Sequence, residues 1–297
     1  MAGIPRSHPN VPVSTKAKKK KRLKSAIKED RHNLYAASVQ CPEADVEFFK
    51  KTFKKHAGRP LRSIREDFCG TAALCAEWVK DHKDNTAVGV DIDEPTLNWG
   101  RENIFPYLSD DQECRIKLVC DDVRAVSNPK VELLNAQNFS YWIFQKREEM
   151  LGYFKVARNS ITDDGLFVMD LMGGTESTEC SVQTRKITDG VRPDGSKIPS
   201  FSYLWDQNTY NPITGEMQCY IHFKMRGGKK INRAFSYKWR VWTLPEIREL
   251  LLEAGFREVD VYTEGWDDEA DDTDGIFRLR KDFDHEGSWI AYVVAKP

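Results

Sequence analysis

The chain has 297 residues, enough for one large domain or two small ones, and its composition is that of an ordinary globular protein. No apolar run reaches the roughly 18 residues of a membrane span, and the first residues lack the apolar core of a secretory signal, so no membrane partner is expected. Lys and Arg (45) nearly balance Asp and Glu (46), but residues 1–32 hold ten basic and two acidic residues and so precede an acidic remainder. An acidic cleft would attract a cationic ligand and disfavour a nucleic-acid backbone.

The seven cysteines are scattered and include no Cys-x-x-Cys pair. Neither a disulfide framework nor a zinc site is indicated. We therefore expect no bound metal and a reducing, cytoplasmic location.

Residues 1–30 are rich in Lys, Pro and Ser and poor in large apolar residues. This composition predicts a disordered basic tail in front of a folded domain at 31–297. The run from Lys18 to Arg22 suits a solvated tail, a nuclear import signal or an arm that binds nucleic acid. A nuclear location and a nucleic-acid partner therefore stay open.

Beyond residue 31, strand and helix patterns alternate, beginning with a helix at 43–55. The expected strands are 61–67, 86–91, 115–120, 131–137 and 165–171, and the expected helices between them are 71–82, one capped by Asp93, and 144–159. This alternation indicates an α/β fold with a doubly wound, mostly parallel, Rossmann-like sheet. Such sheets bind ligands beyond the carboxyl ends of their strands.

The pattern changes after residue 175. Three β-rich segments at 201–206, 217–225 and 231–242, separated by turn signals, predict an antiparallel β cap inserted at about 175–242. A capping box at 243–246 starts a helix that stops at Gly255, and strands at 259–262 and 289–294 complete a sheet of seven strands. The acidic stretch 267–275 is expected to be a solvated loop, because its spacing does not fit an EF-hand.

Acidic residues follow the first three expected strands, at Glu66, Asp91 and Asp121. The turn at 68–72 (Phe-Cys-Gly-Thr-Ala) has one glycine, whereas a dinucleotide site needs several so that the backbone can approach a pyrophosphate. A pyrophosphate would also face the carboxylates of Glu66 and Asp67. The series suits a nucleoside cofactor with hydroxyls, an amine and a positive centre but no phosphate, which describes S-adenosylmethionine.

These motifs resemble those of the class I S-adenosylmethionine-dependent methyltransferases. In that family the first-strand motif reads acid-x-Gly-x-Gly-x-Gly. Here Glu66 matches the acid and Gly70 the central glycine, while Phe68 and Ala72 replace the outer two. The resemblance extends by element order from about residue 31 to the end of the chain.

The resemblance implies a role for each strand-end acid. Asp91 would accept both ribose hydroxyls, since a carboxylate accepts two hydrogen bonds at once, and Asp121 would accept the adenine amino group. Each acid alone would equally cap the helix that follows it. The residues implied to bind the cofactor are Tyr35, Glu66, Cys69, Gly70, Thr71, Asp91, Ile92, Asp121, Asp122, Val123 and Asn138.

In this family the segment after the fourth strand passes under the transferable methyl group. Here it reads Asn-Phe-Ser-Tyr-Trp at 138–142, and Phe139 and Ser140 break its similarity to the Asn-Pro-Pro-Tyr signature of amino-group methyltransferases. Alternatively, these aromatic residues pack against the cap. The aromatic residues of the cap would then fill its core. The residues expected to contact the acceptor are Phe139, Ser140, Trp142, Tyr203 and Trp205.

Methyl transfer needs a positioned nucleophile in a dry site, and a general base only when the nucleophile arrives protonated. Tyr141 and His222 are the candidate catalytic residues, with His32 a third, although a histidine on a sheet face is often structural. The sequence thus predicts a methyltransferase of EC 2.1.1 type acting on N or O of a small molecule. The alternatives are a nucleic-acid or protein methyltransferase that docks through the basic tail, and a cofactor-binding fold without catalysis.

Overall fold

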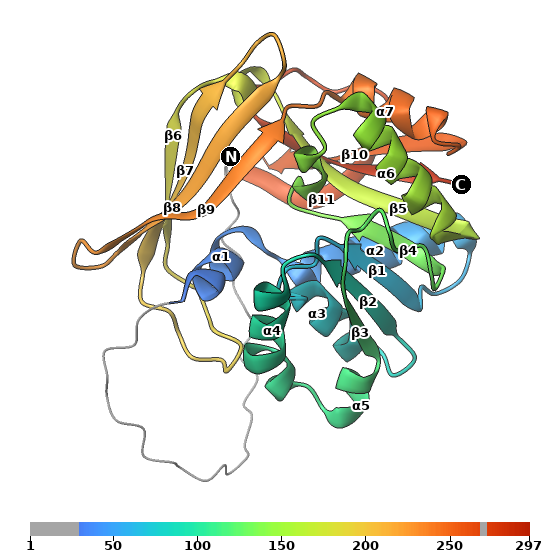
Figure 1. The fold of residues 1–297 in the computed structure, drawn as a ribbon, viewed down its shortest axis with the longest axis horizontal. Helices are drawn as coiled ribbons and strands as arrows, with labels where there is room; N and C mark the ends of the chain where they lie inside the picture. The colour runs from blue at the N-terminus through green and yellow to red at the C-terminus, as the bar shows by residue number, and fades with distance from the viewer. Residues whose placement is uncertain (1–29, 268–271) are drawn as a thin grey trace.

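The computed structural model describes residues 30–267 and 272–297. Two sheets make up the fold (Figure 1): an eight-stranded central sheet flanked by helices, and a four-stranded cap sheet beside it. The basic run at 18–22 lies outside the described residues.

The central sheet has the strand order β11-β10-β12-β5-β4-β1-β2-β3. Five neighbouring strands, from β5 to β3, are parallel, and β12 runs antiparallel to both of its neighbours, β5 and β10. The predicted doubly wound, mostly parallel sheet is therefore confirmed. The strands are β1 (Ser63–Asp67), β2 (Thr86–Asp91), β3 (Ile116–Cys120), β4 (Val131–Ala136), β5 (Ile161–Gly173), β10 (Glu258–Asp267), β11 (Asp272–Arg280) and β12 (Trp289–Lys296).

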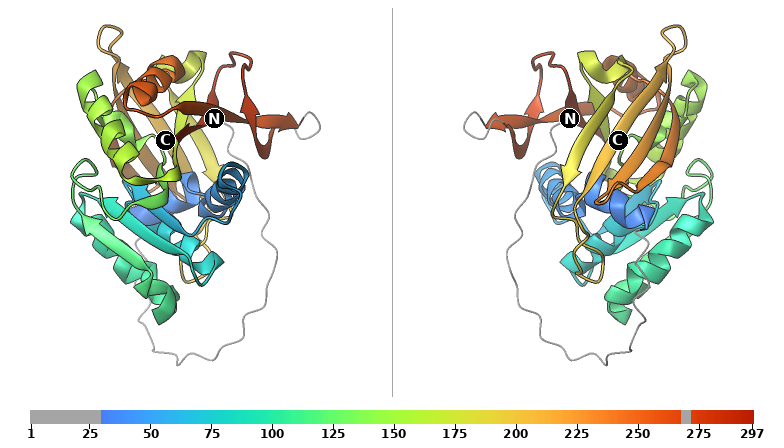
Figure 2. Two further views of the ribbon diagram at one scale, coloured as in Figure 1. Left: turned by 90° about the vertical axis from the view of Figure 1, so that its right-hand side faces the viewer. Right: turned by 90° about the vertical axis from the view of Figure 1, so that its left-hand side faces the viewer.

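Helices cover both faces of the central sheet (Figure 2). Phe49 and Phe53 of α2 and Trp78 of α3 pack on one face, and Phe154 of α6 and Leu250 of α7 pack on the other. Because both faces are covered, five of the six side chains of the central strand β4 are buried. The helices are α1 (Arg31–Val39), α2 (Pro42–Ala57), α3 (Ala73–Asp81), α4 (Glu94–Asn103), α5 (Asp110–Cys114), α6 (Arg147–Asn159) and α7 (Leu244–Glu253).

The edge strand β11 was not expected. Its residues 272–275 belong to the stretch predicted to be a solvated loop, and that prediction is wrong for them, because β11 pairs with β10 from Asp267↔Asp272 to Val261↔Arg280. Phe277 anchors the strand, with its ring 4.4 Å from that of Tyr292 and 5.5 Å from that of Phe48. The strand was missed because its sequence is largely polar, and its described side chains at 273–280 are partly or fully exposed.

The cap sheet is antiparallel, in the order β6-β7-β8-β9, and lies in the chain between β5 and α7. Its strands are β6 (Val182–Ile187), β7 (Phe201–Tyr210), β8 (Glu216–Met225) and β9 (Lys230–Arg240). β6 was not predicted, because five of its six side chains are at least partly exposed and its sequence is mostly polar. The capping box that starts α7 is present: the Thr243 hydroxyl accepts from the Glu246 backbone N–H.

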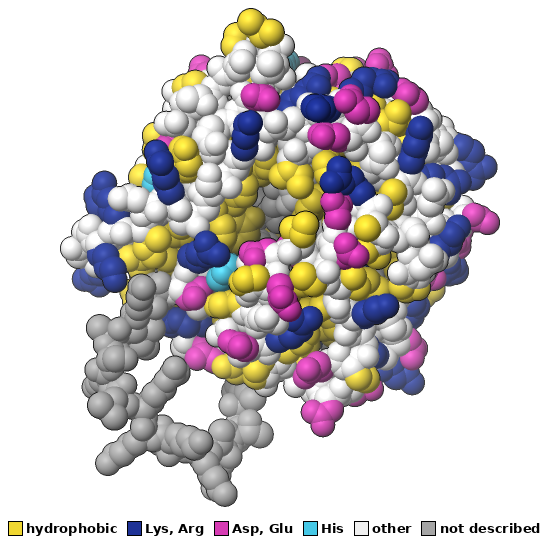
Figure 3. Space-filling view, in the orientation of Figure 1, with side chains coloured by type: hydrophobic (Ala, Val, Ile, Leu, Met, Phe, Trp, Pro, Cys, Tyr) yellow, Lys and Arg dark blue, Asp and Glu magenta, His cyan; other side chains and the backbone are white. Residues whose placement is uncertain are grey.

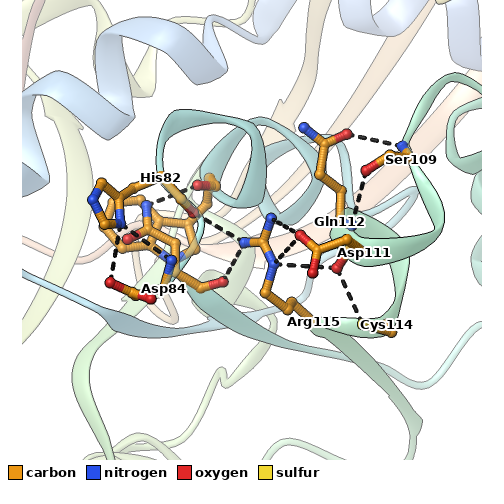
Figure 4. Close-up of polar contacts among 9 residues, drawn as sticks. His82, Asp84, Ser109, Asp111, Gln112, Cys114 and Arg115 are labelled. Carbon is orange, nitrogen blue, oxygen red and sulfur yellow. Dashed lines mark hydrogen bonds and ion pairs between the residues drawn. The ribbon is translucent and has the colours of Figure 1, made fainter.

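A polar cluster closes the amino-terminal end of the parallel strands (Figure 4). Arg115 donates to the backbone oxygens of His82 at 3.0 Å and Asn85 at 2.6 Å, and its Nη2 lies 3.2 Å from Asp111 Oδ2. This one side chain ties α5 to the loop between α3 and β2. Its contacts are internal, at the end of the sheet opposite the strand-end acids.

Within 30–267 and 272–297, no helix is long and apolar enough to cross a membrane. The same residues contain no group of three or more His, Cys, Asp or Glu side chains that could hold a metal ion.

Candidate functional site

The carboxyl ends of β1, β2, β3 and β4 meet at one edge of the sheet, and Glu66, Asp91, Asp121 and Asn138 lie there. Two hydrogen bonds donated by backbone N–H groups link the strand tips directly. The Gly70 N–H donates to Asp91 Oδ2 at 2.7 Å, and the Asp121 N–H donates to the Asp91 carbonyl at 3.2 Å. The structure thus brings together the acids that the sequence had spaced about one strand–helix–strand unit apart.

The turn after β1 keeps a left-handed backbone at all three glycine positions of the family motif, although only one of them is glycine. Phe68, Gly70 and Ala72 have φ angles of 59°, 53° and 58°. Side chains other than glycine pay a steric cost in this left-handed region, and such strain is found most often at functional sites. The alternating left-handed positions are the three glycine positions of the family motif, so the local conformation is retained although two residues differ.

Close packing from neighbouring elements fixes the turn. A Cβ on Gly100 of α4 would lie 2.2 Å from the Thr71 carbonyl oxygen, and a Cβ on Gly89 of β2 would lie 2.9 Å from Cys69 Sγ. Cys69 and Thr71 are buried, so they can reach a ligand mainly through their backbone. Burial also raises the pKa of the Cys69 thiol.

Asp91 presents a carboxylate beside an exposed apolar side chain. Its Oδ1 accepts from the Asp93 N–H at 2.9 Å, and burial raises the pKa of the Asp91 carboxyl. The next residue, Ile92, is 73% exposed. An exposed isoleucine after a strand-end acid offers an apolar surface on which a planar ring could pack.

Asp121 and Asp122 are adjacent but differ in their partners. Asp122 pairs with Arg124 at 2.6 Å, and hydrogen bonding to Arg124 lowers the pKa of the Asp122 carboxyl. Asp121 is exposed, and its Oδ1 accepts only from the next backbone N–H, at 2.8 Å. Of the two acids, Asp121 is therefore better placed to accept from a ligand, while Val123 is buried in the core.

A buried ion pair that the sequence analysis missed supports this loop. Arg65 and Asp67 are 1% exposed and lie 2.6 Å apart, and Arg65 Nη2 donates to the Val123 carbonyl at 3.0 Å. Tyr153 donates to Asp67 Oδ2 at 3.0 Å. An arginine inside a strand predicted to lie in a sheet covered by helices was the available signal, because a buried charge requires partners.

Asp170, on β5 just beyond the last residue paired with β4, was also missed. Its two carboxylate oxygens accept the backbone N–H groups of Asn138 and Phe139, at 2.8 and 2.9 Å, and these residues both have φ of 57°. Asp170 thus holds the segment after β4 in a strained double left-handed turn. Burial raises the pKa of Asp170 to about 7 and that of Glu66 to about 8, and Cys75 donates to the Glu66 carboxyl at 3.2 Å.

Three of the residues predicted to contact the methyl acceptor, Phe139, Trp142 and Trp205, belong to one aromatic cluster. The ring centroids of Phe139 and Trp142 lie 5.8 Å apart, and Trp239 of β9 is 5.9 Å from Trp142 and 5.9 Å from Trp205. Tyr203 and Trp205 are both on β7. The Ser140 hydroxyl instead donates to the Gln137 carbonyl at 2.9 Å, within the turn at Ser140–Ile143.

The candidate catalytic residues have structural partners. Tyr141 is fully buried, and its hydroxyl donates to the Asp170 carbonyl at 2.7 Å. His222 pairs with Asp206 at 3.2 Å and alternates along β8 with the buried residues Ile221 and Phe223. It therefore lies on the outer face of the cap sheet, away from the strand tips. The ring of His32 lies 5.1 Å from that of Trp99.

Tyr35 of α1 contacts the cap. Its ring centroid lies 4.9 Å from that of Phe235 of β9. Burial raises the pKa of the Tyr35 hydroxyl, and the charges of Asp170 and Glu66 raise it further, so Tyr35 lies within electrostatic range of the strand tips. In the space-filling view the surface is hollowed between the cap and the central sheet, and hydrophobic side chains dominate the hollow (Figure 3).

No family model matches the chain, and no curated protein matches it. Among solved structures, an S-adenosylmethionine-dependent methyltransferase from Clostridium acetobutylicum is 14% identical, with 90% of this chain and 98% of that chain covered and a TM-score of 0.62. The chain has the methyltransferase fold. DesVI from Streptomyces venezuelae is 14% identical, with coverages of 89% and 95% and a TM-score of 0.62. CalS10, an amino pentose methyltransferase from Micromonospora echinaspora, is 10% identical, with coverages of 92% and 99% and a TM-score of 0.61.

Proposed function

We propose that the protein is an S-adenosylmethionine-dependent methyltransferase that transfers a methyl group to N or O of a small molecule. The observation that carries the proposal is the glycine-like turn after β1 beside the strand-end acids Asp91 and Asp121. The structures that share the fold support it: CalS10 is described as bound to S-adenosylmethionine, and KedS8, a sugar N-methyltransferase, covers 94% of this chain with a TM-score of 0.57.

The residues at the strand tips suit this cofactor. Asp91 would accept the ribose hydroxyls, Ile92 would pack on the adenine, and Asp121 would accept the adenine amino group. A ligand with a positive charge would favour the ionised forms of the buried Glu66 and Asp170 carboxyls, whose pKa values burial raises. A dinucleotide fits less well, because its phosphates would approach the same carboxyls and a turn that carries Phe68 and Ala72.

When bound, S-adenosylmethionine supplies an electrophilic methyl group on a positively charged sulfur. The chain's own contribution would then be to orient the acceptor and to exclude water, and the aromatic cluster of Phe139, Trp142 and Trp239 is suited to both. Tyr141 and His222 stay predictions as catalytic residues. Both side chains are engaged in hydrogen bonds within the protein, so we assign neither of them a proton-transfer step.

Calorimetric titration with S-adenosylmethionine and S-adenosylhomocysteine tests the cofactor assignment. We expect both to bind wild-type protein, and Asp91→Ala to weaken binding by about 10-fold or more, since two hydrogen bonds to a charged group are lost. Asp163→Ala removes an exposed acid on β5 and should leave binding unchanged. Absence of binding by wild type, or equal binding by Asp91→Ala, would rule the assignment out.

The described residues provide no observation that favours a nucleic-acid or protein acceptor, since the basic run that suggested one lies at 18–22. A cytoplasmic location likewise stays a prediction.

A further inference from the structure

The inner face of the cap sheet is mostly apolar and aromatic, with the polar side chains of Gln183 and Gln207 and one charge. Strand register places Arg185 beside Tyr203, and in the same layer Tyr203 faces Phe223, and Trp205 faces Ile221. Continuing across β9, this layer includes Phe235, Tyr237 and Trp239. Within the cap strands at 182–240, Arg185 is the only charged side chain on this inner face.

The guanidinium of Arg185 is incompletely satisfied. One nitrogen, Nη2, donates to the Ser38 carbonyl near the end of α1, and the group lies 5.3 Å from the ring centroid of Tyr203. Its Nε–H is buried and has no hydrogen-bond acceptor. Among the described residues no carboxylate forms an ion pair with Arg185, although ten other arginines and lysines do so.

A helix carbonyl compensates part of this charge, because the carboxyl end of a helix carries partial negative charge. It does not satisfy the remaining donors, and a buried N–H without an acceptor is costly. Three further buried donors in this region also have no acceptor: the side-chain nitrogens of Gln137, Trp142 and Trp239. These unpaired donors outnumber the one buried acceptor without a partner on β4, Asn135 Oδ1.

The position of Arg185 relates it to the strand tips. Arg185 donates to the Ser38 carbonyl near the end of α1, Tyr35 of the same helix lies 4.9 Å from Phe235 of the cap, and the charges of Asp170 and Glu66 raise the pKa of the Tyr35 hydroxyl. The site thus has acidic groups at the sheet and a cation in the cap. The acidic side suits a sulfonium, and the cationic side suits an anion.

We propose that Arg185 binds a carboxylate group of the acceptor, so that the substrate is a small carboxylic acid that bears the N or O to be methylated. The proposal rests on the methyltransferase function proposed above. Arginine is suited to this task because its paired N–H groups match the two oxygens of a carboxylate. Bound in this way, the carboxylate would accept a hydrogen bond from the Arg185 Nε–H. It would also hold the nucleophile of the substrate between the cap and the strand tips.

The test combines two measurements on wild type, Arg185→Met and Arg185→Lys. Methyl transfer from labelled S-adenosylmethionine is measured on a small-metabolite extract that has been split by anion exchange at alkaline pH, where amino acids are anions. We expect wild type to label the retained, anionic fraction and Arg185→Met to lower that labelling about 10- to 100-fold, since a charge-assisted pair is lost. Arg185→Lys keeps the charge without the paired N–H groups and should give an intermediate loss.

Calorimetry with S-adenosylmethionine and its decarboxylated analogue distinguishes the two possible carboxylates. If the acceptor supplies the carboxylate, Arg185→Met binds both ligands within about twofold of wild type. If Arg185→Met weakens only S-adenosylmethionine, the carboxylate belongs to the cofactor and the proposal is wrong. Lys186→Met is the matched control, because Lys186 is the next residue of β6 and is exposed. It should change neither measurement.

Two further outcomes are decisive. Label that accumulates only in the unretained fraction, or that is unaffected by both Arg185 variants, would overturn the proposal while leaving the methyltransferase function in place. Failure of wild type to bind S-adenosylmethionine would remove the methyltransferase function itself. Thermal unfolding identifies any variant that has lost its fold, and Arg185→Lys, which retains the contact to the Ser38 carbonyl, then carries the comparison.

Discussion

Burial sets the protonation of three carboxyl groups at the strand tips near neutral pH. It raises the pKa of Glu66 to about 8, that of Asp170 to about 7 and that of Asp67 to about 6. Because the folded pKa of each group exceeds its unfolded value, the folded protein binds more protons than the unfolded chain between those values. Stability therefore falls as pH rises through this window.

Replacing Glu66 by Gln isolates one of these groups. The unfolded pKa of a glutamate is about 4.3, so wild type should lose stability between about pH 4 and pH 8 while Glu66→Gln should lose less. We expect the difference in free energy of unfolding to grow with pH by up to about 1.4 kcal/mol per unit inside the window. Urea denaturation at several pH values measures it. Glu253→Gln is the control, because Arg147 lowers the pKa of that exposed carboxyl, so it stays ionised throughout the window and its removal should give a profile parallel to that of wild type. Parallel profiles for wild type and Glu66→Gln would contradict the role of burial.

Among the secondary-structure elements, α5 depends most on a single side chain. It has five residues, too few for a helix to be stable alone, and Arg115 joins it to the loop after α3. We expect Arg115→Met to lower the free energy of unfolding by about 1–3 kcal/mol, since buried carbonyl oxygens lose their donor, and to leave cofactor binding unchanged. Chemical denaturation measures the free energy of unfolding, and calorimetry measures cofactor binding.

Arg147→Met is the control. It removes an exposed ion pair with Glu253 and should leave the unfolding midpoint unchanged. Loss of cofactor binding by Arg115→Met would show that this end of the sheet is coupled to the strand tips.

The sequence predicted elements where local pattern and burial agree. β2 was predicted with its observed bounds, Thr86–Asp91, because its short apolar run lies between a turn and an acidic residue, and these two signals fix both ends of the strand. β6 and β11 were not predicted, since their sequences are largely polar and only pairing with the neighbouring strands β7 and β10 makes them strands. The strand-end acids could be read from their spacing. The left-handed Phe68 and Phe139 could not, because their conformations are imposed by packing and by the Asp170 carboxylate. The position of Arg185 on the inner face of the cap could not be predicted either, because it follows from the pairing of β6 with β7.

At the scale of the whole molecule, α1 connects the two sheets over the strand tips. It contacts the cap through Tyr35 and through the backbone acceptor of Arg185, and it contacts α4 through His32 and Trp99. A Cβ on Gly190, in the loop after β6, would lie 2.9 Å from that of Ala37. A ligand that enters between the cap and the central sheet would therefore pass close to α1.

This arrangement predicts that α1 opens in the free protein and closes on the ligand. A nine-residue helix has little stability of its own, so its contacts with the cap and α4 must hold it, and local opening should be frequent. In hydrogen exchange by mass spectrometry, peptides that cover α1 should exchange quickly without ligand and about 10-fold more slowly with S-adenosylhomocysteine. Peptides from β7 and β8 should change little, because their hydrogen bonds lie within the cap sheet. If α1 exchanges as slowly as β5 in the free protein, then α1 is a fixed part of the fold, and ligands must enter by another route.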